Sequence, residues 1–156
     1  MLFEVNASDI FEISALIAAE AETSSILPRC VDYVADHLPS FAIVRCDDKV
    51  IGCASYRIFY QIGEPAIAEI RSLVVNPEYR KQGYGDFLMM EIAREIGERC
   101  VKNIFVFTLI PEFFERYGFH KVDNNYVIKS AWLEDCNGCR HNGTDCKEIF
   151  MVKEVK

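Results

Sequence analysis

The sequence has no run of apolar residues that approaches the roughly 18 needed for a membrane-spanning helix. Its N-terminus lacks the basic and then apolar segments that mark a secretion signal, because it reads MLFEVNASDIFE. Basic residues are in the minority, with 17 Lys and Arg against 24 Asp and Glu, and the net charge of −7 argues against a nucleic-acid partner. We therefore expect a cytoplasmic protein that binds neither a membrane nor nucleic acid.

A framework of disulfide bonds is not expected either, because the seven cysteines are an odd number. Cys30, Cys46, Cys53 and Cys100 lie singly within or beside predicted helices and strands, which is typical of reduced thiols in a reducing compartment. The sequence also has no internal repeat and no low-complexity segment. With 156 residues, of which 51% are hydrophobic, the chain can bury one sizeable core, and residues 1–156 are predicted to form a single domain.

The most informative segment is a strand, a loop and a helix near the middle of the chain. Ile70–Val75 is rich in β-branched residues and predicts a buried strand that Asn76 and Pro77 end. Over Tyr84–Arg99 apolar residues recur four apart, with charged residues mostly opposite, which predicts a helix. The loop before this helix is Arg80–Gly85, which reads RKQGYG.

Two glycines make this loop a candidate anion site. The first turn of a helix has unpaired N–H groups and the positive end of the helix dipole. Gly83 and Gly85 have no side chain to keep a phosphate from the backbone, and Arg80 and Lys81 add positive charge. The spacing matches neither the P-loop nor the dinucleotide-binding fingerprint. We expect a phosphate-bearing cofactor, and the alternative is a turn that simply precedes an amphipathic helix.

The remaining segments show strand and helix patterns in a mixed order. Strands are predicted at Leu2–Val5, Phe41–Cys46, Val50–Tyr60, Ala66–Val75, Ile104–Leu109, Phe119–Val122 and Glu148–Val152. Besides the helix after the loop, helices are predicted over Ile10–Ile17, Ile26–Leu38 and Glu112–Tyr117. The order βααβββαβαββ, with both hairpins and helical crossovers, predicts an α/β (α+β) fold with a mixed sheet flanked by helices.

The pattern R-x-x-G-x-G after a strand, together with FFERYGF at Phe113–Phe119, resembles the GNAT superfamily of N-acetyltransferases. The resemblance implies a mostly antiparallel central sheet and acetyl-CoA as the cosubstrate, with backbone amides of the loop holding the pyrophosphate. It also implies that the strand before the loop is splayed from its neighbour and offers its main chain to the cofactor. The implied cofactor contacts are Leu73, Val74, Val75, Arg80, Lys81, Gln82, Gly83, Tyr84, Gly85 and Asp86.

Five further segments narrow the resemblance. They are ILPR from Ile26, VIGCAS from Val50, AEIRSLVV from Ala68, PEFFERYGF from Pro111, and the late KSAW with its cysteines and CKE. Together they resemble the amino-acid N-acetyltransferases that make N-acetylglutamate for arginine synthesis. The resemblance implies transfer to the α-amine of a small amino acid, with L-glutamate leading. The alternatives are another small amine, a protein N-terminus, or a non-catalytic module that binds acyl-CoA.

Acetyl transfer to an amine needs a base, because an α-amine is mostly protonated at neutral pH. Glu69 on the strand that enters the loop is the candidate, and its alternative role is to pair with Arg71 on the same strand face. Many members of the superfamily have a proton-donating tyrosine where this chain has Phe114, which cannot donate. Tyr117 is a weak candidate for the general acid that protonates the thiolate, so the sequence leaves this role unassigned.

An acceptor with two carboxylates needs cationic partners, and the arginine fork suits them best. Arg29 and Arg71 lie inside the segments that carry the resemblance, and Lys129 precedes the tryptophan segment. Each of the three could instead be a solvated or structural charge. The sequence leaves open whether the chain forms a homodimer.

The late segment contains three cysteines and a histidine within a few residues of one another. Cys136, Cys139, Cys146 and His141 supply the four N and S ligands that a structural zinc site requires, but the spacing lacks a second C-x-x-C. Locally packed reduced cysteines are the first alternative, and a redox-active pair is the second.

Overall fold

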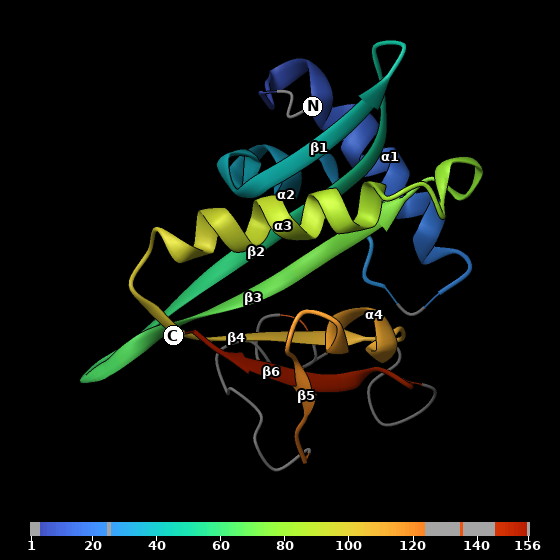
Figure 1. The fold of residues 1–156 in the computed structure, drawn as a ribbon. Coiled ribbons are helices and arrows are strands. Elements are labelled where there is room, and N and C mark those ends of the chain that lie inside the picture. The colour runs from blue at the N-terminus through green and yellow to red at the C-terminus, as the bar shows by residue number, and fades with distance from the viewer. Residues whose placement is uncertain (1–3, 25, 124–134, 136–145, 156) are drawn as a thin grey trace. The chain divides into compact units, whose positions relative to one another are not determined.

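The computed structural model describes residues 4–24, 26–123, 135 and 146–155 (Figure 1). Its helices are α1 (Ile10–Ala21), α2 (Val31–Asp36), α3 (Tyr84–Gly97) and α4 (Pro111–Glu115), with short 3-10 helices η1 (Ala7–Asp9), η2 (Leu38–Ser40) and η3 (Pro77–Tyr79). Its strands are β1 (Phe41–Cys46), β2 (Lys49–Gln61), β3 (Glu64–Val75), β4 (Val101–Thr108), β5 (His120–Lys121) and β6 (Ile149–Glu154).

The strands form one sheet in the order β1-β2-β3-β4-β6-β5. The β3–β4 pair is parallel, whereas the β1–β2, β4–β6 and β5–β6 pairs are antiparallel. The predicted mixed, mostly antiparallel sheet flanked by helices is therefore confirmed. None of the helices in the described part of the chain is both long and apolar enough to cross a bilayer.

The chain divides into two compact units, each built from two stretches of sequence. The first unit comprises Met1–Tyr56 and Ile70–Glu98, and the second comprises Arg57–Glu69 and Arg99–Lys156. Strands β2 and β3 each contribute to both units, because the division falls within them.

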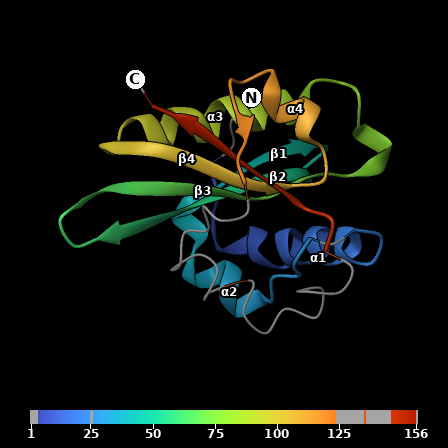
Figure 2. The same ribbon diagram turned by 90° about the horizontal axis from the view of Figure 1, so that it is seen from below.

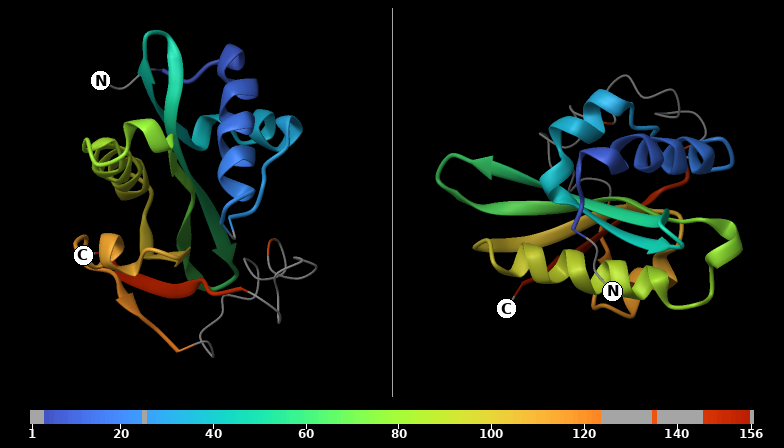
Figure 3. Two further views of the ribbon diagram at one scale, coloured as in Figure 1. Left: turned by 90° about the vertical axis from the view of Figure 1, so that its right-hand side faces the viewer. Right: turned by 90° about the horizontal axis from the view of Figure 1, so that it is seen from above.

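In the first unit, helices lie on both sides of β1 and β2. Helices α1 and α2 lie on one side and α3 on the other (Figure 2), and α1 and α2 are in contact with each other (Figure 3). Ile13, Ile17 and Val34 of the helices pack against Ile43 and Cys53 of the strands. Burial of these apolar side chains supplies most of the free energy that holds the helices on the strands.

On the other side of β2, the close packing of neighbouring side chains depends on Gly52. A Cβ at Gly52 would lie 2.8 Å from Cγ2 of Val44 and 3.2 Å from Cδ1 of Leu88, which is on α3. Glycine at this position leaves room for the side chain of Val44 and for the close approach of Leu88 from α3.

The β1–β2 hairpin turns through Asp47 and Asp48, with Cys46 paired to Lys49. Both aspartates have positive φ, 48° and 63°, as a two-residue turn that matches the twist of its strands requires. The strands predicted at Phe41–Cys46 and Val50–Tyr60 are therefore joined by a hairpin turn.

In the second unit the core is aromatic. Phe59, Phe105 and Phe150 pack together, with the Phe105 and Phe150 ring centroids 5.6 Å apart. The parallel β3–β4 ladder ends at the pair Glu69 and Phe105, although β3 continues to Val75.

The N-terminal elements differ from the predicted ones. Glu4 and Val5, the described part of the strand predicted at Leu2–Val5, have no regular secondary structure. Asn6 forms a capping box with Asp9, which turns the chain into a helix at that point. The helix predicted over Ile26–Leu38 is confined to α2, because its N-cap residue Cys30 is still extended with ψ 166°.

Candidate active site

Polar residues are buried in a row along β3. Glu69, Arg71 and Ser72 are 4%, 4% and 8% exposed. Ser72 has a positive φ of 53°, a conformation that is strained for a residue other than glycine and that interrupts the regular strand. Two side chains of β2 stabilise this part of β3: Ser55 Oγ donates to the Arg71 carbonyl at 3.3 Å, and Cys53 Sγ donates to the Ser72 carbonyl at 3.5 Å.

Burial keeps the Cys53 thiol protonated, as its hydrogen bond to the Ser72 carbonyl requires. Desolvation raises the pKa of its thiol from 9.0 to about 12. Cys53 therefore stays a neutral donor at physiological pH and is a poor nucleophile. Its role is to support β3.

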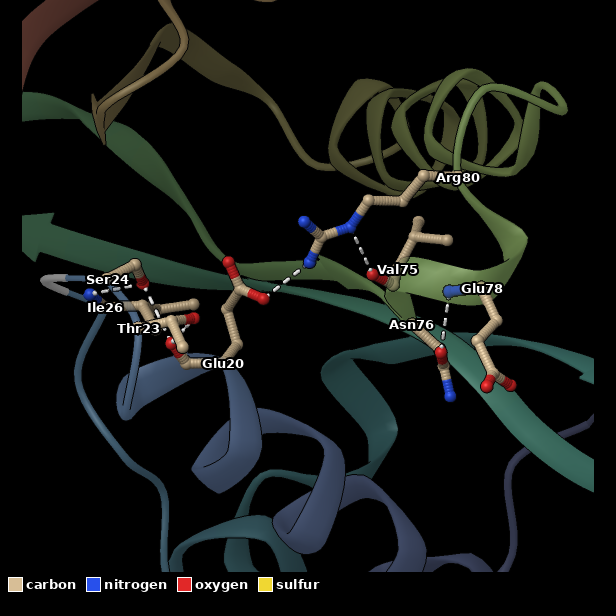
Figure 4. Close-up of polar contacts among 8 residues, drawn as sticks. All are labelled: Glu20, Thr23, Ser24, Ile26, Val75, Asn76, Glu78 and Arg80. Atoms are coloured by element: carbon tan, nitrogen blue, oxygen red, sulfur yellow. Dashed lines mark hydrogen bonds and ion pairs between the residues drawn. The ribbon is translucent and has the colours of Figure 1, made fainter.

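The loop predicted at Arg80–Gly85, which we call the cofactor loop, has at Gly83 a backbone conformation that favours glycine. Asn76 connects it to the sheet, since its N–H donates to the Ile51 carbonyl at 2.8 Å. The Asn76 Oδ1 accepts from Glu78 N–H at 3.0 Å (Figure 4). Gly83 then adopts φ 86° as the N-cap of α3, and α3 begins at Tyr84 as predicted.

The start of α3 has the features of an anion site. No side chain caps the helix at Gly83, and a Cβ added there would meet nothing within 4 Å. The N–H groups of the first helical turn have no carbonyl partner within the helix and carry the positive end of its dipole. Lys81 and Gln82 are exposed beside them. A phosphate group could therefore approach the backbone of the cofactor loop.

Arg80 connects the cofactor loop to two other elements. Its Nε donates to the Val75 carbonyl at 2.8 Å, and its Nη2 lies 2.5 Å from Oε2 of Glu20 at the end of α1 (Figure 4). Arg80 thus holds the loop on the strand and the helix, and Glu20 balances its charge. Sequence reasoning missed Glu20, because the ion pair joins residues 60 positions apart without a local pattern.

The two arginines predicted to bind the acceptor meet at one tyrosine. Arg71 Nη1 donates to the hydroxyl of Tyr33 at 3.0 Å. The guanidinium carbon of Arg29 lies 4.4 Å from the centroid of the Tyr33 ring, in a cation–π contact. His37 stacks on the same ring with centroids 4.2 Å apart. Tyr33 was not a predicted site residue, since nothing in the sequence marks a tyrosine on a short helix as functional.

Several predicted site residues lie outside the described residues: Lys129, Cys136, Cys139 and His141. Cys146 is described and exposed. Within the described ranges, no group of three or more His, Cys, Asp or Glu side chains could hold a metal ion, so the predicted zinc site has no support there. Phe114, at the position where the resemblance implies a tyrosine in many members of the superfamily, is 2% exposed and packs edge-on against Phe119.

Comparison with known proteins agrees with this geometry. The model of the Acetyltransferase (GNAT) family matches residues 8–119. The uncharacterized N-acetyltransferase CT2212 of Chlorobaculum tepidum is 33% identical over 148 residues, which cover 95% of this chain and 92% of that protein.

More distant matches are amino-acid acetyltransferases. The one from Neisseria meningitidis serogroup A is 32% identical over 120 residues, 74% of this chain but 26% of that protein, so this chain spans about a quarter of the relative. The fold also matches N-acetylglutamate synthase from Neisseria gonorrhoeae, solved with coenzyme A and N-acetyl-glutamate. The TM-score is 0.84 at 22% identity, over 100% of this chain and 35% of that one.

The family match covers most of the chain, and the relative in Chlorobaculum tepidum aligns over nearly its whole length. The β3 strand, the glycine-containing loop and α3 lie within the matched region. This chain belongs to the GNAT family of N-acetyltransferases.

Proposed function

We propose that this protein transfers the acetyl group of acetyl-CoA to the α-amine of a small amino acid, and that L-glutamate is the acceptor. Residues 1–156 act as a single GNAT domain in this proposal. The product, N-acetylglutamate, would assign the protein to arginine synthesis. The names of the amino-acid acetyltransferases that the chain resembles support an amino acid as the acceptor. The N-acetylglutamate synthase whose fold the chain shares is the reason for choosing glutamate.

The cofactor loop supports acetyl-CoA as the donor. Its open backbone at Gly83 and the positive end of α3 suit the diphosphate of the coenzyme. The β3–β4 ladder ends at Glu69, so the later residues Leu73, Val74 and Val75 are outside that ladder. Their main-chain groups are the proposed contacts for the pantetheine arm, although the Val75 carbonyl already accepts from Arg80.

The observation that carries the choice of glutamate is the meeting of Arg29 and Arg71 at Tyr33. Two guanidinium groups around one ring supply positive charge for an amino acid with two carboxylates. Arg71 is almost fully buried, where its charge is screened less than at the surface.

The chemistry requires that the acceptor lose protons, that a C–N bond form, that the C–S bond break and that the thiolate gain a proton. Glu69 is the proposed base, directly or through water, that takes a proton from the ammonium group of the acceptor. The neutral nitrogen then attacks the thioester carbonyl, the C–N bond forms, and the C–S bond breaks. The nitrogen loses its second proton to water and the departing thiolate takes one from water, because Phe114 has no proton to give. Correct placement of the two reactants contributes a large part of the rate.

A thiol-release assay with acetyl-CoA and each of the twenty amino acids tests the proposed function. We expect release that depends on the added amino acid and is fastest with L-glutamate. Glutamine and aspartate are the matched controls, since one lacks the side-chain charge and the other is shorter by one methylene. Faster turnover of a neutral or basic amino acid would contradict the assignment of the acceptor.

The buried Phe114 favours one rival, a module that binds acyl-CoA without turnover. Isothermal titration with CoA separates the two functions. Binding of CoA without thiol release from acetyl-CoA in the presence of any amine would favour the rival, and glutamate-dependent release would exclude it.

A further inference from the structure

We infer that Tyr33 binds the acceptor directly, by donating its phenolic hydrogen to a carboxylate of the amino acid. This inference rests on the proposed function, because it assigns a residue to the same acceptor site. It gives Arg71 an indirect role, that of a buried charge which acts through the tyrosine.

The first argument comes from the hydrogen bonds of the hydroxyl group. A tyrosine hydroxyl can accept and donate at the same time. Tyr33 Oη accepts from Arg71 Nη1 at 3.0 Å. Among the described residues the structure shows no hydrogen bond that this hydroxyl donates, so its donor capacity remains for a ligand. A donor from a cationic group polarises the hydroxyl and strengthens the bond that it can give to an anion.

The second argument is the difference in exposure between Arg71 and Tyr33. Arg71 is 4% exposed, whereas Tyr33 and Arg29 are half-buried. A ligand in contact with solvent can therefore reach the hydroxyl of Tyr33 and the guanidinium of Arg29 more easily than the guanidinium of Arg71. The guanidinium of Arg71 acts on such a ligand through the hydroxyl to which it donates.

The third argument is that the tyrosine is held in place. His37 stacks on its ring with an angle of 22° between the planes, and His37 Nδ1 lies 2.8 Å from the Tyr33 carbonyl oxygen. Arg29 contacts the ring by its guanidinium, and the Arg29 carbonyl accepts from Ser14 Oγ at 2.7 Å. A preorganised donor loses little entropy when the acceptor binds.

Substitution Tyr33→Phe tests the inference, because it removes the hydroxyl and keeps the ring that contacts Arg29 and His37. We expect the KM for glutamate to rise about tenfold, the effect of one charge-assisted hydrogen bond. We expect kcat and the KM for acetyl-CoA to change less than about threefold, since a group that binds the acceptor uniformly acts on that KM alone.

The matched control is Tyr60→Phe, which removes a hydroxyl from a tyrosine that is 80% exposed. Its kinetic constants should stay within about twofold of the wild type. Tyr33→Leu removes the ring as well and should raise the KM for glutamate further, by about tenfold beyond Tyr33→Phe, because the contact with Arg29 is also lost. Tyr33→Phe alone decides the result if circular dichroism shows that Tyr33→Leu does not fold.

The outcomes separate this inference from the proposed function. Wild-type turnover of glutamate with an unchanged KM in Tyr33→Phe would overturn the role of Tyr33 and leave the proposed function intact. Equal rises in the KM for glutamate and for acetyl-CoA would show a structural role and overturn it too. A wild-type protein that does not turn over glutamate would overturn both.

Discussion

Glu69 is the residue on which activation of the acceptor depends in the proposed reaction. It is 4% exposed at the last rung of the β3–β4 ladder. Glu69→Gln keeps the shape of the side chain and removes its basicity. We expect kcat at neutral pH to fall by about 10²- to 10³-fold, the usual contribution of a general base. The loss should shrink as the pH approaches the pKa of the free amine, because more acceptor is then neutral without a base.

Thiol release measured across the pH range checks this prediction. Glu64→Gln is the control, because it makes the same change at an exposed position on the same strand. Its pH profile should match that of the wild type. A Glu69→Gln variant with the wild-type rate and profile would show that another group, or water alone, accepts the proton.

Single residues were predictable from the sequence where their role depends on the local chain. Gly83 is an example, because its positive φ and its position before α3 follow from a glycine between a loop and a helix pattern. Tyr33 was not predictable, since its contact with Arg71 joins residues 38 positions apart. The positive φ of Ser72 gives no sequence signal either, because serine usually avoids that conformation.

The cofactor loop is the element whose geometry is easiest to test. Gly83→Ala adds a side chain at φ 86°, where an L-residue costs about 1–2 kcal/mol. The loop must shift to relieve this strain, and its N–H groups then no longer converge on a phosphate. We expect the KM for acetyl-CoA to rise about tenfold and the free energy of unfolding to fall by about 1 kcal/mol.

Gly97→Ala is the control for this prediction, because Gly97 ends the same helix, has no positive φ, and has open space at its Cβ. It should raise stability by about 0.5–1 kcal/mol, as alanine does for glycine in a helix, and leave the KM for acetyl-CoA unchanged. Kinetics and denaturant unfolding measure both effects. The same rise in KM for both variants would indicate that helix α3, and not the cofactor loop, was disturbed.

Whole elements were predictable where hydrophobic periodicity was strong. The strand at β3, the helix α3 and the β1–β2 hairpin lie close to their predicted positions. The predicted helix over Ile26–Leu38 was too long, because Pro28 and the extended Cys30 delay its start to Val31. The pairing order of the strands also needed the structure, since it depends on contacts between distant segments.

At the scale of the whole molecule, the negative net charge opposes the binding of CoA, which the cofactor loop favours. The chain carries −7, and the diphosphate of CoA is itself an anion, so long-range attraction does not explain affinity. Short-range contacts to N–H groups at the start of α3 must supply it. The diphosphate should therefore supply most of the stabilisation that CoA gives to the fold.

Thermal unfolding with two ligands checks this consequence. CoA at about 100 times its Kd should stabilise the protein by about 2.7 kcal/mol and raise the Tm by about 5–10 °C for a chain of this size. Pantetheine at the same concentration lacks the diphosphate and should raise the Tm by less than a third of that shift, since it cannot contact the cofactor loop. Equal shifts with the two ligands would mean that affinity comes from the pantetheine arm. They would contradict the proposal that the start of α3 binds the diphosphate of the coenzyme.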